Sequence, residues 1–124
     1  MLLDLATIET KSLIGATPLR PVPTADRLLR AIREIAGPLA VVLSHREIPW
    51  ASITFSGARH RMALRFAGSD AVSDGESFIC ALPDHEFRIR GHLVADAAVT
   101  RVDHECLPAP LMEVECEILV LDED

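Results

Sequence analysis

The stretch TADRLLRAIREIAG, residues 24–37, decides the fold, because it predicts an amphipathic helix on which the rest of the chain can pack. Thr24 is a good N-cap, since its hydroxyl can accept a hydrogen bond from a free amide of the first turn. Asp26 suits the positive end of the helix dipole, Gly37 can take the left-handed C′ position, and Pro38 prevents continuation. The apolar side chains recur at helical spacing and form one stripe: Leu28, Leu29, Ile32, Ile35 and Ala36.

The sequence after this helix predicts strands and no second strong helix. Pro49 is expected to separate two strands, Gly57-Ala58 to form a turn, and residues 67–77 to form a polar loop. Ahead of the helix, residues 2–9 fit either a short first strand or a loose amphipathic segment, and the prolines of residues 10–23 predict an extended lead. The expected strands are residues 39–45, 50–56, 59–66, 78–82, 86–102 and 111–121.

Two of these segments alternate clearly between apolar and charged side chains, which is typical of antiparallel strands with one face covered. Residues 59–66 turn Met62, Leu64 and Phe66 to one face, and residues 111–121 turn their three Glu to the other. The last part of residues 111–121 is apolar on both faces, because Leu119 and Leu121 share the face of the three Glu.

We therefore predict a single α+β domain over residues 1–124. One central helix, about 24–36, packs on a curved, mostly antiparallel sheet of five to six strands. The small residues Ala95, Ala97 and Ala98 are the natural place for that helix to approach the sheet.

Composition indicates an ordinary soluble protein, with 49% hydrophobic and 25% charged residues. The start, MLLDLATIET, lacks the basic region of a signal peptide, and the apolar run 38–43 is too short to cross a bilayer. Three cysteines leave one unpaired in any disulfide scheme, so we expect a reducing, cytoplasmic location. Cys80 and Cys116 lie among apolar residues, and we expect both to be buried.

Charge and motifs exclude several classes of function. The net charge is −7, and from Asp103 onward there are eight acidic residues and no Lys or Arg. With no Tyr and one Trp to stack on bases, we do not expect nucleic-acid binding. His104 and Cys106 lie two residues apart, but zinc needs two further ligands, so we predict no metal and no cofactor. Residues His92 and Asp96 are about 13 Å apart along a strand, which is too far for a catalytic pair.

The predicted outer face of the sheet carries arginines on two strands and glutamates on a third. One interpretation is a solvated face with cross-strand ion pairs, each contributing about 0.2–1 kcal/mol. The other is a face that binds an anion, a small ligand or a protein, because Arg is enriched at such sites. Its candidate binding residues are Arg61, Arg65, Arg88, Arg90 and His92.

The proline lead RPVP (20–23) followed by this helix, together with GHLVADAAV (91–99), resembles the hotdog fold of acyl-thioester hydrolases and dehydratases. The glycine that usually opens the hotdog helix is replaced here by Thr24-Ala25, and an additional strand follows at 111–121. The resemblance implies chemistry at the helix N-terminus, where free amides polarise a thioester carbonyl, with Asp26 as the nearby acid.

Two functions remain open at this stage. The first is a non-enzymatic binding or assembly module that forms a homodimer through a sheet edge or the outer face of the sheet. The alternative is a hotdog-like enzyme acting on acyl thioesters.

Overall fold

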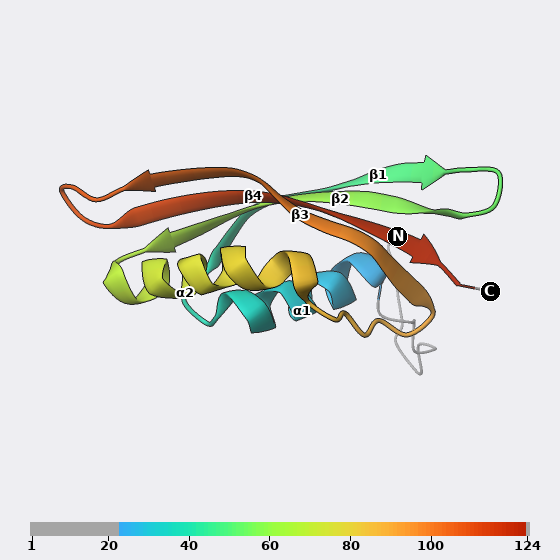
Figure 1. Cartoon of the computed structure of the whole chain (residues 1–124), viewed down its shortest axis with the longest axis horizontal. Helices are drawn as coiled ribbons and strands as arrows, with labels where there is room; N and C mark the ends of the chain where they lie inside the picture. Colours follow the sequence, from blue (N-terminus) through green and yellow to red (C-terminus); the bar gives the residue numbers. More distant parts are fainter. Residues whose placement is uncertain (1–22, 124) are drawn as a thin grey trace, which may run out of the picture.

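The chain forms two layers, a four-stranded antiparallel sheet and a pair of helices on one of its faces (Figure 1). The computed structural model describes residues 23–123, so the predictions for residues 2–9 and most of 10–23 lie outside the described residues. The helices are α1 (Thr24–Ala36) and α2 (Ser69–Ala81), the latter continuing into a 3-10 turn, η2 (Leu82–Asp84). The strands are β1 (Val41–Ala51), β2 (Ser56–Ala67), β3 (His92–Glu105) and β4 (Leu111–Asp122), in the spatial order β1-β2-β4-β3.

The α+β class with an antiparallel sheet is confirmed, whereas two finer expectations are wrong. Within residues 23–123 there are four strands rather than five or six, and the sheet is open rather than curled around one helix. One face of the sheet is covered by both helices, and the other, which we call the bare face, has no layer packed on it by the described residues (Figure 1). Neither helix in this part of the chain is long and apolar enough to cross a membrane.

Helix α1 follows its predicted stripe but begins differently. Leu28, Ile32 and Ala36 are buried, as the helical spacing predicts. The N-cap is Pro23, so the prediction of Thr24 as N-cap is wrong; Thr24 is the first helical residue, and its hydroxyl is hydrogen-bonded to a side chain of β3. Gly37 ends the helix with φ 91° and ψ 168°. This is an extended conformation with positive φ, which glycine tolerates, and not the left-handed helical conformation that was predicted.

Helix α2 replaces the predicted loop 67–77 and the predicted strand 78–82, and both predictions are wrong. Four of its residues point inward at helical spacing: Ala71, Val72, Gly75 and Phe78. A Cβ on Gly75 would lie 2.9 Å from the ring of Phe66 and 3.1 Å from Sδ of Met112, so glycine allows the helix to approach the sheet closely. Cys80, predicted to be buried, is exposed on this helix.

The first hairpin also departs from the prediction. Strand β1 runs through Pro49, and the turn lies at Ser52–Phe55, where the Ser52 amide donates to the Phe55 carbonyl at 2.7 Å. The predicted break at Pro49 and turn at Gly57-Ala58 are therefore wrong. Proline is tolerated in β1 because β1 is an edge strand, which pairs on one side only.

Strand β3 begins six residues later than predicted, and two β-bulges change which residues face the helices. The bulges lie between Val94 and Asp96 and between Val99 and Arg101. The side chains of β3 that pack against the core are Val94, Ala97 and Val99. Of the three alanines predicted to meet the helix, only Ala97 does so.

The central strands β2 and β4 form the sheet side of the core, as their alternation predicts. Leu64 is paired with Val114, and Met62 with Cys116, and all four side chains are buried beneath the helices. Burial raises the pKa of the Cys116 thiol to about 12, so this cysteine stays protonated at neutral pH. The apolar end of β4 on the bare face is largely covered as well, since Leu121 is only 6% exposed.

Candidate functional site

A group of polar side chains converges where α1 begins, at one end of the sheet. We call it the histidine cluster; its members come from α1 and from all four strands: Thr24, His45, Glu47, His60, His92 and Asp122. Thr24, Glu47, His60 and Asp122 line a cavity of about 110 Å³. The sheet register places His45 and His60 on the covered face, opposite Met62 and Ile118 respectively.

His60 is the one buried polar or charged side chain among residues 23–123, at 1% exposure. Its Nδ1 lies 2.9 Å from Nε2 of His45, so one ring donates this hydrogen bond and the other accepts it. Burial lowers the pKa of His45, against the opposing charges of Glu47 and Asp26. Burial, followed by the charge of His45, lowers the pKa of His60. Both effects favour a neutral pair at neutral pH.

This pair predicts a loss of stability on acidification. Because the folded-state pKa values lie below the ordinary 6.5, the unfolded chain binds more protons than the folded one between those values and 6.5. Stability should therefore change little well above pH 6.5 and fall as the pH drops through 6.5 toward the folded-state pKa values. Urea denaturation at a series of pH values measures this. His45→Gln should flatten the slope, because its amide can still donate to His60 but does not titrate.

The matched control for that experiment is His104→Gln, which removes an exposed histidine on β3. It should leave the slope below pH 6.5 unchanged. Equal slopes in the wild type and His45→Gln would contradict the assignment of the pH dependence to the buried pair.

The second half of the cluster joins a hydroxyl, an imidazole and a carboxylate. Thr24 Oγ1 lies 2.9 Å from Nε2 of His92, and Nδ1 of His92 lies 3.2 Å from Oδ1 of Asp122. The second contact is within ion-pair distance but lacks hydrogen-bond geometry, so buried Nδ1 has no hydrogen-bond partner in the structure. The Thr24–His92 bond ties the first turn of α1 to the start of β3.

The predicted site residues do not gather on one face. Arg61 and Arg65 lie on the bare face of β2, whereas Arg88 and Arg90 lie between η2 and β3, beside α1. There the Arg90 carbonyl accepts a hydrogen bond from Arg27, at 2.8 Å. His92 belongs to the histidine cluster. Asp26, the acid implied by the hotdog resemblance, lines a groove on α1 and does not line the histidine cavity.

Cross-strand ion pairs occupy the bare face, as one of the two sequence interpretations predicts. Arg59 and Arg61 both donate to Glu117, at 2.9 and 2.7 Å, and Arg65 donates to Glu113 at 2.9 Å. The hydrogen bond from Arg61, joined by that from Arg59, lowers the pKa of Glu117. Arg59, Arg61 and Arg65 are thus already paired within the chain.

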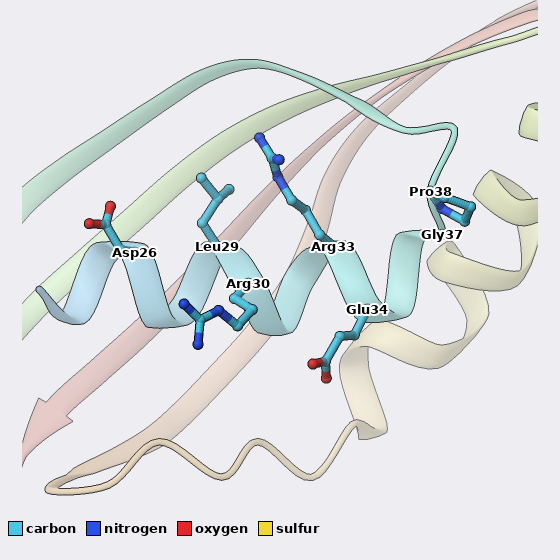
Figure 2. Close-up of a pocket in the computed structure, with 7 residues that line it drawn as sticks. All are labelled: Asp26, Leu29, Arg30, Arg33, Glu34, Gly37 and Pro38. Carbon is cyan, nitrogen blue, oxygen red and sulfur yellow. The ribbon is translucent and has the colours of Figure 1, made fainter. Parts of the chain in front are cut away.

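Three of the eight exposed large apolar side chains among residues 23–123 lie close together in the chain, at the start of β1. Leu39, Val41 and Leu43 are 51, 54 and 41% exposed. In the chain they follow Pro38, which lines an open groove of about 590 Å³ along α1, where Leu29 and Arg33 project toward β1 (Figure 2). We call the three side chains and this groove the edge surface. The groove is lined by Asp26, Leu29, Arg30, Arg33, Glu34, Gly37 and Pro38.

In the part of the chain that the structure describes, no three His, Cys, Asp or Glu side chains are arranged so that they could hold one metal ion. No protein-family model matches the chain, and no curated protein or solved structure matches it either. The functional argument consequently rests on the histidine cluster and the edge surface.

Proposed function

We propose that the protein is an assembly module, two copies of which join through the edge surface. The observation that carries this proposal is the row of exposed apolar side chains where an edge strand begins: Leu39 just before β1, and Val41 and Leu43 on it. An edge strand presents unpaired backbone N–H and C=O groups, and an exposed apolar edge favours pairing with another chain.

The two edges of the sheet differ in a way that supports β1 over β3. Strand β3 is interrupted by two bulges, and its exposed second half carries Arg101 hydrogen-bonded to Asp103 at 2.9 Å. Bulges and charges are the usual means of blocking edge-to-edge association. Strand β1 has a single bulge, between Val42 and Ser44, and its apolar side chains lie around that point.

The groove beside β1 has the composition that a twofold interface needs. In such a dimer the same patch occurs on both sides, so it must be complementary to itself. Asp26 and Glu34 line the groove together with Arg30 and Arg33, and Leu29 and Pro38 supply apolar contact. Antiparallel packing of α1 on its copy can bring an acid of one subunit to an arginine of the other.

The bare face is a weaker candidate for assembly than the edge surface. Its arginines are hydrogen-bonded to Glu113 and Glu117, and burying these pairs in an interface would incur a desolvation penalty. Leu121, whose apolar character suggests a partner on this face, is already buried within the chain.

Sedimentation equilibrium at micromolar concentration tests the proposal. The wild type should have twice the chain mass of 13.5 kDa. Val41→Arg should bring the mass down to that of one chain, because it places a charge in the apolar row. The matched control is Val102→Arg, which changes a similarly exposed valine (42%) on the other edge strand and should leave the dimer intact. A monomeric wild type, or equal effects of the two variants, would overturn the proposal.

A further inference from the structure

The histidine cluster contains an arrangement that assembly does not require. Thr24, His92 and Asp122 come from α1, β3 and β4 and meet as a hydroxyl, an imidazole and a carboxylate. The hydroxyl is 2.9 Å from Nε2 of the ring, and the carboxylate is 3.2 Å from Nδ1. In this order the three groups can activate the oxygen: the ring takes the hydroxyl proton, and the carboxylate stabilises the resulting imidazolium.

The surroundings of the two ring nitrogens of His92 favour the tautomer that this use requires. Its Nδ1 is buried, and the nearest acceptor is the Asp122 carboxylate, whose side chain is 55% exposed. A proton on Nδ1 leaves Nε2 free to accept the hydrogen bond from Thr24. A small rotation of Asp122 would convert the present 3.2 Å contact into a hydrogen bond, since such bonds are often loose before a substrate binds.

The hydroxyl also borders a space in which an acyl group can lie. Thr24 and Asp122 line the cavity of about 110 Å³, together with the buried His60. A volume of this size holds roughly three or four water molecules, so it suits a short acyl chain rather than a long one. The first intrahelical hydrogen bonds of α1 are donated by Asp26 and Arg27 to the Pro23 carbonyl, so the Thr24 and Ala25 amides precede them and have no intrahelical acceptor.

We propose that Thr24 is an acyl acceptor, which takes a short acyl group from an activated ester or thioester with His92 as the base. Thr24 Oγ1 attacks the carbonyl carbon while its proton passes to Nε2 of His92. The bond from that carbon to the oxygen or sulfur leaving group breaks, and the leaving group departs with the proton from His92. Water then attacks the carbonyl carbon of the Thr24 ester and gives a proton to Nε2 of His92. The bond from that carbon to Thr24 Oγ1 breaks, His92 returns the proton to Oγ1, and the carboxylic acid leaves.

Acylation is tested on the full chain with 4-nitrophenyl acetate and an acetyl thioester as donors. The wild type should release a burst of one 4-nitrophenolate per chain, and peptide mass mapping should locate one acetyl group on Thr24. Thr24→Ser should keep the burst, and Thr24→Val should lose it. His92→Gln should slow acylation by about 100-fold or more, the usual contribution of a general base.

Asp122 acts through His92 and is a positioning residue, so its test needs its own readout. Asp122→Asn should lower the acylation rate at saturating donor and shift the pH profile of acylation, with little change in the donor concentration for half-maximal rate. Thr100→Val, which changes an exposed threonine on β3, is the matched control and should acylate as the wild type does.

Two results overturn the proposal. One is the absence of an acetyl group on Thr24 in a folded wild type, and the other is equal acetylation of the Thr24→Val variant, which would place the adduct elsewhere. Circular dichroism of each variant shows whether it is folded. If Thr24→Val unfolds, Thr24→Ser still tests the proposal, because its hydroxyl can keep the hydrogen bond to His92 that holds α1 to β3. The outcome is independent of the mass measurement that tests assembly.

Discussion

Gly57→Ala is expected to destabilise the protein by about 3 kcal/mol or more, the upper end of what over-packing costs. A Cβ at this position would overlap the backbone carbonyl of Val120 and come within 2.8 Å of Cα of Leu121. Both atoms belong to the backbone of β4, which cannot rotate away as a side chain can. The two central strands would have to separate locally, and the hydrogen bonds between them would lengthen.

Guanidinium denaturation measures this loss, and Ser56→Ala on the adjacent exposed residue is its control, expected to stay within about 0.5 kcal/mol. Gly75→Ala provides a graded comparison, because its Cβ would meet side-chain atoms of Phe66 and Met112, which can shift. A fully stable Gly57→Ala would show that β2 and β4 do not approach each other in this way.

Phe66→Ala is the second change with a large expected effect, about 3–5 kcal/mol. The Phe66 side chain is fully buried on β2, and its ring lies 6.1 Å from the ring of Phe78 on α2. Removing it leaves a cavity between the sheet and α2, where Gly75 supplies no side chain to refill the space. A domain with a typical stability of about 5–15 kcal/mol would lose a large part of it.

The same denaturation experiment on Phe55→Ala is the matched control. Phe55 lies in the turn between β1 and β2 and is 49% exposed, so its loss should cost little. Similar losses for the two phenylalanines would mean that residues 69–81 do not pack as a helix against β2.

The sequence predicts those elements whose side chains alternate between two clearly different environments. The stripe of α1 and the alternation of β2 and β4 are of this kind, and each is found where expected. Helix α2 shows little such contrast, because Ser, Asp and Gly occupy much of it and Gly75 marks close packing rather than a turn. It packs on Phe66 of β2 through Gly75 and Phe78, a contact that local sequence does not encode.

Two further differences come from where the strands lie in the sheet. Pro49 would break a central strand, and only the position of β1 at the edge makes it compatible with continuous pairing. The bulges of β3 move side chains from one face to the other, so a strict period of two assigns Leu93 and Ala95 to the wrong side. Neither fact can be obtained from residue spacing.

The candidate sites were predicted only in part, because their residues are brought together by the fold and are far apart in the sequence. The N-terminal end of α1 is the one place where the sequence suggests chemistry, and His92 is among the predicted binding residues. His45 and His60 are 15 residues apart, and Thr24 and His92 are 68 apart, so no motif links them. A signal was nevertheless present: His60 occupies an inward position in the alternation of β2, where an apolar residue is the norm.

Amide hydrogen exchange of the two edge strands tests most directly whether two copies join along β1. Half of the N–H groups of an edge strand point away from its neighbour and exchange quickly unless a second chain covers them. We expect those of β1 from Val41 to Ile48 to be protected at high protein concentration and to lose protection on dilution or in Val41→Arg, while those of β3 stay fast throughout. Outward amides of β1 that exchange as fast as those of β3 at every concentration would contradict the account.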